Sequence, residues 1–576
     1  MKLKIIFIGI ISLVALSSCE DFFDVTPKGS IPVEDYQWQI NNLRISMNAV
    51  YNQLQQNDYQ LSELVFGECM SDNVYTRQDN DGSELSQLLN FQFNNENSYI
   101  LKRYEVNYRG INLANQVISS VPKLKYNENY NEGTVEIRYI LGEAKLCRAL
   151  FYFNLVRTFG GVVIQPEASE LTNKVLARSS ADEVYAYIEK DLREACLLLY
   201  KNRWKGSDAG KPNIGAGLGL LMKVLAYQAS PGVKLTQPAR EQKWLEAKEI
   251  GELFIDGNSL NYDKMLKFTA RYTETWDDLS KRLMLKNLNV TKESVIAGDV
   301  ANIHGLVNFQ DLFRLKGEFS KESLFEINHY DYSSTGIDID ETSSVFHYTT
   351  HINAGPVGIS PTEYLIANRN TDPRGLYSVV YRTDHGNSEF FLDENGNRVS
   401  LEYFTIADGY LFNKYMMYPN EGSENERNYR IMRYAEALLW YAEILNETGD
   451  HAKATQILNL VRARAAKLIT DECPDKKYND CTTCPLYTIM PYEEIKKNIQ
   501  YERRMELVCE FDRWYDIVRL GVVGEKLFAL KNPPDKDSGT PRWRGKYFKK
   551  GVNELFPIPQ KEIIISNGVI TQNFGY

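Results

Sequence analysis

After its sixteenth residue the chain has no apolar run of the roughly 20 residues that a membrane-spanning helix needs. This absence excludes a helical membrane protein. Positive charge is not in excess either, since the chain has 66 Lys and Arg against 76 Asp and Glu, and its net charge is −10. An acidic chain is a poor partner for nucleic acid or anionic lipid, so we exclude electrostatic capture of polyanions.

Motifs for cofactors and metals are missing as well. The sequence contains no His-Glu-x-x-His, no Gly-x-Ser-x-Gly and no Walker loop, because residues 206–211 continue into Pro212. The six histidines show no metal-ligand spacing. Calcium-like stretches at 79–84 and 393–396 lack the first ligand and the closing glutamate, and are expected to be turns. We therefore predict no cofactor, no bound metal and no catalytic residue.

The first nineteen residues indicate a lipoprotein signal. Two lysines precede an apolar run at 5–16, and two serines follow before Cys19. A charged start, a short apolar stretch and small residues before the cut are typical of a secretory leader. We predict a signal peptide at 1–18, lipidation at Cys19 and a lipidated tether at 19–33. An ordinary cleaved leader with a cysteine at this place by chance is the alternative.

Seven further cysteines form an odd set, so not all of them can pair internally. Those in helical patterns are expected to be small buried hydrophobic side chains: Cys147, Cys196 and Cys509. Cys473, Cys481 and Cys484 share one polar segment. We favour one disulfide there, in a surface loop, over a zinc site, because no histidine or fourth cysteine follows at ligand spacing.

Helical periodicity dominates the chain. Apolar residues recur at three- and four-residue intervals in these segments: 35–54, 100–121, 136–158, 182–200, 216–229, 242–254, 430–447, 451–467 and 493–519. The fold is therefore predicted to be mainly α. Long irregular stretches at 66–99, 258–362 and 375–428 are rich in aromatic residues, Asp, Asn and Gly, and are expected to carry function and minor β structure.

Two helix pairs have the character of tetratricopeptide repeats. In residues 435–449 a helix with small residues at packing intervals ends at a Gly-Asp turn, and a second helix follows at once. Residues 142–161, continued by the helix from Ala181, show the same arrangement. Small residues let antiparallel helices approach closely, and successive pairs stack into a superhelix. We predict a tetratricopeptide-like helical scaffold whose long loops form a ligand-binding face.

Four blocks, in this order, resemble the SusD/RagB family of outer-membrane nutrient-binding lipoproteins: 143–161 with 180–192, 429–443 with 458–464, 502–519, and 555–559 with 572–576. The resemblance runs from the leader to the last residue. Residues 162–164 lack the proline expected after the paired glycines, and Phe511 stands where a glycine is usual. We interpret both departures as structural variation.

The resemblance also implies how the chain is divided. We expect an N-terminal helical region at 34–230, a loop-rich ligand-binding insertion at 231–428 and a C-terminal helical region at 429–576. Residues 19–576 are expected to form one compact unit.

The block 502–519 is rich in charge at helical spacing. Glu502, Glu506 and Glu510 lie four residues apart, and Arg513 and Asp516 lie three apart. Buried charges usually persist because they are paired, so we predict buried ion pairing on this helix that holds the fold, in preference to catalytic carboxylates.

Sugars present apolar faces and hydroxyl edges, so a glycan site needs aromatic platforms flanked by polar side chains. Two segments have this mixture in the regions that the family uses for ligands. The predicted ligand-binding residues are Asp72, Asn73, Tyr75 and Arg77, at the start of an aromatic-polar stretch that reaches Phe93, and Trp276, Tyr330, Tyr332, Phe346 and Tyr348 in the long insertion. Core packing is the alternative for each aromatic residue.

The resemblance implies a cell-surface lipoprotein that binds oligosaccharide or polysaccharide without catalysis. It would pass the glycan to a SusC-like TonB-dependent transporter in the outer membrane, where a lipid anchor alone holds it. The Cys-Glu-Asp start resembles the export signal of surface lipoproteins in the Bacteroidetes. Peptide binding, as in some relatives, is one alternative. A helical surface glycoside hydrolase is another, and it requires two carboxylates roughly 5–9.5 Å apart, one with a raised pKa.

Overall fold

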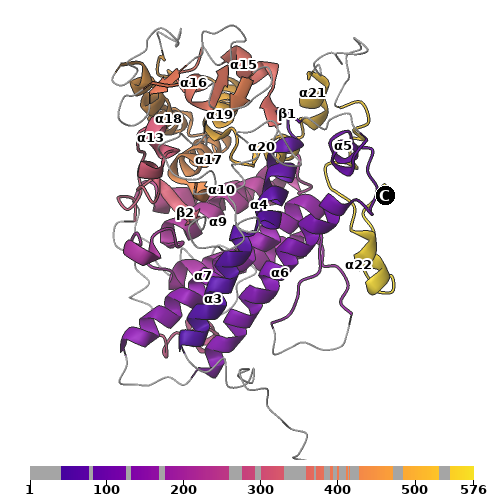
Figure 1. The fold of residues 1–576 in the computed structure, drawn as a ribbon. Coiled ribbons are helices and arrows are strands. Elements are labelled where there is room, and N and C mark those ends of the chain that lie inside the picture. Colours follow the sequence, from indigo (N-terminus) through magenta and orange to yellow (C-terminus); the bar gives the residue numbers. More distant parts are fainter. Residues whose placement is uncertain are drawn as a thin grey trace, which may run out of the picture.

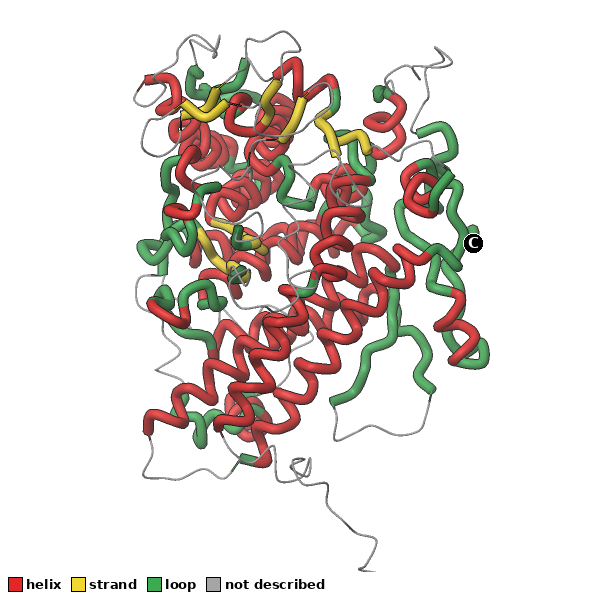
Figure 2. The backbone as a smooth tube through the Cα atoms, in the orientation of Figure 1, coloured by secondary structure: helices red, strands yellow, loops and turns green. Residues whose placement is uncertain are grey.

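The computed structural model describes residues 40–76, 82–124, 131–167, 175–257, 275–291, 300–329, 359–368, 371–381, 390–392, 398–400, 410–412, 414, 427–470, 484–530 and 545–576. Helices dominate this part of the chain, and the strands within it are short (Figure 2). The predicted mainly α fold is confirmed.

The helices of the N-terminal half are α3 (Ile40–Gln55), α4 (Asn57–Leu64), the π-helical turn η2 (Val65–Cys69), α5 (Glu84–Leu89), α6 (Ser98–Ser120), η3 (Val121–Lys123), α7 (Asn131–Phe159), α8 (Ala181–Leu198), η5 (Gly206–Asp208), α9 (Ile214–Ala229) and α10 (Gln237–Phe254). Those of the C-terminal half are α12 (Trp276–Arg282), α13 (Phe309–Leu312), η6 (Leu315–Gly317), α15 (Glu363–Asn368), α16 (Gly375–Ser378), α17 (Tyr434–Glu447), α18 (His451–Thr470), α19 (Tyr492–Leu507), α20 (Arg513–Arg519), α21 (Val523–Phe528) and α22 (Gln560–Ile565). The strands pair antiparallel as β1 (Val74–Thr76) with β3 (Ile359–Pro361), β2 (Ser323–Ile327) with β8 (Tyr429–Arg433), β4 (Val379–Tyr381) with β7 (Tyr410–Phe412), and β5 (Phe390–Leu392) with β6 (Arg398–Ser400).

The helices pack in successive pairs. Helix α6 lies against both α3 and α7, and the pairs α7–α8, α9–α10 and α17–α18 follow along the chain, with α9 and α10 both in contact with α17 (Figure 1). Glycines at the contacts allow neighbouring helices to approach each other closely. A Cβ on Gly142 would lie 3.0 Å from the Cβ of Leu198, and one on Gly251 would lie 2.2 Å from the Tyr441 ring. The predicted tetratricopeptide-like layout is therefore confirmed.

Local sequence sets the helix boundaries. Helix α8 begins with a capping box, in which the Ser180 side chain accepts from the backbone N–H of Glu183 while the Glu183 carboxylate accepts from the backbone N–H of Ser180. Helix α9 is buried along its whole length, as expected for a helix that is apolar on all sides. Helix α17 ends at Glu447, and Gly449 follows with a φ of +86°, which is favourable only for glycine, before α18 begins.

The acids of the block 502–519 are buried and paired, as predicted. Asp516 pairs within the block, with Arg503 and Arg519, but the partners of Glu502, Glu506 and Glu510 come from outside it. Arg433, at the end of β8, donates to Glu322 at 2.8 Å and to Glu506 at 2.6 Å. Arg374 pairs with Glu502 at 2.8 Å. The prediction that the pairing lies on one helix is wrong, because the block is divided between α19 and α20 and its glutamates pair with segments far away in the sequence.

The chain's last residues pack against the end of α7. The Asn573 side chain donates to the backbone oxygens of Phe159, at 2.9 Å, and Phe556, at 2.7 Å. Gly161 passes so close to the loop before α8 that a Cβ there would lie 2.3 Å from the Ser179 oxygen. The first and fourth sequence blocks are thus contact partners in space.

Phe511 has a left-handed backbone, with φ +63°, and its side chain is buried beside Tyr429 at a ring separation of 5.7 Å. Glycine would relieve a strain of about 1–2 kcal/mol, whereas loss of a buried phenyl group costs about 3–5 kcal/mol. We therefore expect Phe511→Gly to lower the free energy of unfolding by about 2 kcal/mol, measured by urea denaturation. An unchanged or increased stability would contradict this explanation of the departure from the family glycine.

The buried cysteines behave as predicted at Cys147, Cys196 and Cys509, which are free thiols in the core. Cys484 is also a free thiol, and its Sγ lies 4.0 Å from the backbone oxygen of Arg462. It therefore takes no part in the disulfide that we favoured from the sequence. Cys473 and Cys481, like Cys19, the predicted lipidation residue, lie outside the described residues. Among the described residues, no helix combines the length and apolar composition that crossing a membrane requires.

Candidate ligand-binding face

The short ladder of β1 and β3 joins the segment that holds Asp72, Asn73 and Tyr75 to residues 359–361. Thr76 lies opposite Ile359 and Val74 opposite Pro361. Strand β1 ends just before Arg77, and β3 follows the stretch that contains Tyr330 to Tyr348. The ladder lies beside α15 in the upper part of Figure 1. We call Tyr75, Glu363 and Tyr364 at this ladder the β1–β3 face.

Asp72 and Asn73 are buried below this face, at 2% and 1% exposure. The Asp72 carboxylate accepts from Arg513 at 2.7 Å and pairs with Arg504 at 3.1 Å. Asn73 Oδ1 accepts from Arg504 Nε at 2.8 Å, and Asn73 Nδ2 donates to Glu68 at 2.9 Å. The polar atoms of Asp72 and Asn73 thus bind other protein groups. These two side chains hold β1 in place instead of making the direct ligand contact that we expected.

Asp72 should make stability sensitive to acid. Burial alone would raise the pKa of its carboxyl, but Arg513 and Arg504 lower that pKa well below its usual value. A carboxylate with a lowered folded-state pKa contributes stability above its unfolded pKa of 3.8, and this contribution is lost as the pH falls further. We expect Asp72→Asn to cost about 2 kcal/mol at neutral pH and progressively less as the pH falls below 3.8, measured by urea unfolding. A difference independent of pH would contradict this assignment.

Tyr75 reaches α15 from β1. Its hydroxyl donates to Glu363 Oε2 at 2.5 Å, and its ring is 8% exposed. The next residue, Tyr364, is 38% exposed, and the Arg504 guanidinium lies 3.6 Å from the centre of its ring. Sequence reasoning missed Glu363 and Tyr364. The available signal was an acid-aromatic pair directly after the irregular insertion segment.

The rest of the aromatic stretch up to Phe93 packs inside the protein. Phe91 contacts the rings of Trp514 and Phe548, at 5.9 and 5.2 Å. Phe93 stacks on Phe556 at 5.5 Å. Core packing, the alternative given for each aromatic residue, accounts for these two.

Trp276 is attached to a different part of the scaffold. It is the first residue of α12, whose N-terminus has a capping box of Thr275 and Asp278. Arg282 at the other end of α12 pairs with Glu194 of α8 at 2.7 Å. The Trp276 side chain is half-buried against the hydrophobic core. Five other predicted residues lie outside the described residues: Arg77, Tyr330, Tyr332, Phe346 and Tyr348.

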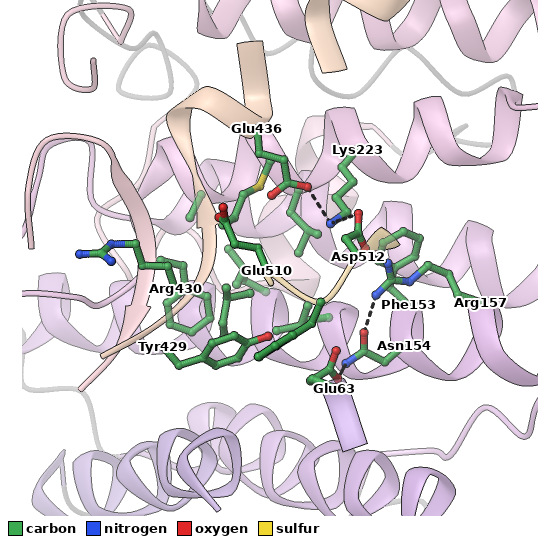
Figure 3. A pocket seen from close by; sticks show the side chains of 18 of the residues that line it. Glu63, Phe153, Asn154, Arg157, Lys223, Tyr429, Arg430, Glu436, Glu510 and Asp512 are labelled. Carbon is green, nitrogen blue, oxygen red and sulfur yellow. Dashed lines mark hydrogen bonds and ion pairs between the residues drawn. The ribbon is translucent and has the colours of Figure 1, made fainter. Parts of the chain in front are cut away.

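An internal polar cavity of about 40 Å³ lies between α4, α7, α9 and β8 (Figure 3). Lys223 pairs there with Glu436 at 2.8 Å and with Asp512 at 3.0 Å, and Arg157 pairs with Asp512 at 2.6 Å. A volume of this size fits about one or two water molecules. The cavity is too small for a sugar, and its acids Glu436 and Asp512 are neutralised by Lys223 and Arg157.

Metal binding finds no support in the part of the chain that the structure describes. No group of three or more His, Cys, Asp or Glu side chains there is arranged to hold an ion.

The fold defines a tetratricopeptide-like helical scaffold with short strand pairs, and comparison with known proteins identifies its family. Residues 21–225 match the family model described as "Starch-binding associating with outer membrane", and residues 357–576 match the model of the SusD family. The chain belongs to the SusD/RagB family.

Similar proteins match over nearly their whole length. SusD-like protein P38 of Formosa agariphila is 25% identical over 90% of this chain and 91% of its own. SusD-like protein P2 of the same organism is 24% identical, with 100% of both chains covered.

Solved structures confirm the fold. A SusD homolog from Bacteroides thetaiotaomicron has a TM-score of 0.67 at 20% identity, covering 94% of this chain and 98% of its own. A laminarin-binding SusD-like protein has a TM-score of 0.61 at 23% identity, covering 93% and 99%. Surface glycan-binding protein A from Bacteroides thetaiotaomicron has a TM-score of 0.62 at 19% identity, covering 94% and 100%.

Proposed function

We propose that this chain binds oligosaccharide at the cell surface and delivers it to a SusC-like TonB-dependent transporter. Membership of a family whose matching model is described as starch-binding carries the proposal. The names of the laminarin-binding and glycan-binding neighbours agree with it.

The β1–β3 face supplies suitable chemistry. Tyr364 offers an exposed aromatic ring that the Arg504 guanidinium holds from one side, and Glu363 places a carboxylate next to it. A sugar ring can stack on the tyrosine while its hydroxyls bond to the acid. Tyr330 and Tyr348 of the insertion 231–428 lie outside the described residues and stay predicted ligand contacts. Trp276 on α12 would contact a longer chain.

The chain is anchored to the outer membrane through lipid on Cys19 and faces the cell surface. The family-model description, which includes association with the outer membrane, supports this location. Several acyl chains contribute about 0.8 kcal/mol per buried methylene, enough for stable attachment. The tether 19–33 links the lipid to the helical body that begins at α3.

Binding is proposed to occur without turnover. The acids that stand out in the sequence, Glu502, Glu506 and Glu510, are all paired with buried cations. A glycosidase needs one acid with a raised pKa in a cleft, whereas cationic neighbours lower the pKa of Glu506 and Glu510 although burial opposes this.

The test is calorimetric titration of the full-length protein in detergent with a panel of host, plant and microbial glycans and peptides, followed by chromatography of each bound glycan. We expect one glycan class to bind and to be recovered intact, with weaker binding by Tyr364→Ala, Trp276→Ala or Tyr348→Ala. Binding of peptides alone would establish the peptide-binding alternative. Cleaved glycan would establish the hydrolase.

A further inference from the structure

A second pocket lies at a distance from the β1–β3 face, in the groove between α3 and α7. It has a volume of about 570 Å³, within the range of sites for small ligands. Arg44 and Tyr51 line it from α3, and Glu136, Tyr139 and Glu143 line it from α7. The spacings of seven residues bring each helix's polar and aromatic side chains to one side. Figure 1 shows α3 and α7 in the lower part of the molecule, whereas β1 and α15 lie at the top.

Aromatic rings form one wall of this α3–α7 pocket. Trp204, from the segment before η5, is half-buried and is fixed by an Nε1–H bond to the Pro212 oxygen at 3.1 Å. The Tyr200 ring lies 4.4 Å from the Trp204 ring, and the Tyr139 ring meets it edge-on at 5.4 Å. These contacts hold the indole in one orientation, and the Lys211 ammonium lies 5.7 Å from the ring centre. The indole is therefore a preformed aromatic platform with a cation at its side.

The charged groups of the pocket are matched to one another. Arg44 pairs with Glu136, and Lys211 pairs with Asp208 at 2.6 Å. No uncompensated charge is left among these four, which disfavours an ionic ligand.

Glu143 provides a polar group at the bottom of the pocket. It is 1% exposed, and its Oε2 accepts from the Tyr51 hydroxyl at 2.8 Å, whereas Oε1 has no hydrogen-bond partner among the described residues. Burial raises the pKa of this carboxyl to about 7, although Lys211 and Tyr51 act to lower it and Asp208 and Glu136 act to raise it. Either form of this carboxyl can bond to a hydroxyl, since the neutral form both donates and accepts hydrogen bonds and the ionised form accepts them.

We propose that the α3–α7 pocket is a second saccharide-binding site, in which an uncharged sugar ring stacks on Trp204 and bonds through a hydroxyl to Glu143. The ligand that fits a rigid aromatic wall, balanced charges and one buried hydrogen-bonding group is neutral, with an apolar face and hydroxyl edges. The site shares no residue with the β1–β3 face, so binding at the pocket does not depend on binding at that face.

Hydrogen–deuterium exchange of the full-length protein in detergent, with and without maltoheptaose or laminarihexaose, tests the proposal. We expect slower exchange at 134–143 and 204–211 with one of these sugars. Trp204→Ala should raise at least tenfold the sugar concentration that gives half of the full protection. Glu143→Gln, a change of nearly equal shape, should weaken it while leaving the melting temperature close to that of the wild type. Tyr547→Ala, at an exposed tyrosine outside the pocket, is the matched control.

Each outcome separates the two sites. Protection confined to 72–76 and 359–364 would overturn the second site and leave the proposed function intact. Protection at the α3–α7 pocket that both variants lose would support the second site, whatever happens at the β1–β3 face. Absence of protection at both places with both sugars, or protection at the pocket that neither variant changes, would overturn the second site.

Discussion

Glu506→Gln is expected to lower the free energy of unfolding by about 3–5 kcal/mol. The Glu506 carboxylate is fully buried and touches three guanidinium groups: Arg433 at 2.6 Å, Arg374 at 3.1 Å, and Arg464. A neutral amide leaves these cations in the interior without their shared counter-charge. The cost arises from uncompensated buried charge, since the attraction of a buried pair is largely offset by desolvation.

Urea denaturation measures this change, and an exposed ion pair supplies the control. Asp58 and Lys102 lie 2.7 Å apart at side-chain exposures of 50% and 41%. Asp58→Asn should alter stability by less than about 1 kcal/mol, because solvent screens an exposed pair. If Glu506→Gln lowered the free energy of unfolding no more than Asp58→Asn does, the buried ion pairs of Glu506 would not hold the fold.

Gly67→Ala is the second change with a large expected effect. A Cβ at this position of η2 would lie 1.8 Å from the backbone oxygen of Phe511. The contact is with backbone, which cannot rotate away, and Phe511 already has a left-handed φ of +63°. Either η2 or the turn at 509–511 must move. We expect a loss of about 3 kcal/mol or more in urea denaturation, as for severe overpacking.

Gly524→Ala is the matched control. Gly524 lies in α21, and the nearest atoms to a Cβ there belong to the Phe548 ring at 3.9 Å. Alanine favours the helix over glycine, so the variant should be unchanged or up to about 1 kcal/mol more stable. Equal effects of the two substitutions would show that η2 does not depend on its close contact with Phe511. Because Glu68 of η2 accepts from Asn73, Gly67→Ala should also displace β1.

Much of the helical scaffold was predictable because helices and their pairing leave local signals. The Gly-Asp turn after α17 and the small residues of α7 are properties of short segments, and both have the predicted structure. The partners of α19 were not predictable from spacing. Arg374 and Arg433 reach Glu506 from 132 and 73 residues away, and no local pattern encodes such a distance.

The sequence singled out the segment of β1 but not the roles of its residues. Residues 72–75 do lie at the ladder where the long insertion returns. A polar-aromatic sequence, however, does not show which side chains face solvent. Asp72 and Asn73 face the buried Arg504 and Arg513, whereas Tyr364, which the pattern did not single out, is exposed beside them. Tertiary contacts alone distinguish these roles.

The central claim is that the β1–β3 face binds glycan. The most direct measurement is calorimetric titration of the full-length protein with maltoheptaose and laminarin oligosaccharides, comparing wild type, Tyr364→Ala and Tyr547→Ala. Both tyrosines are exposed, at 38% and 43%, and only Tyr364 belongs to the face. We predict that at least one glycan binds the wild type, that Tyr364→Ala weakens it about tenfold, or about 1.4 kcal/mol, and that Tyr547→Ala leaves it unchanged. Equal affinities in all three proteins, or no binding of either glycan to the wild type, would contradict the claim.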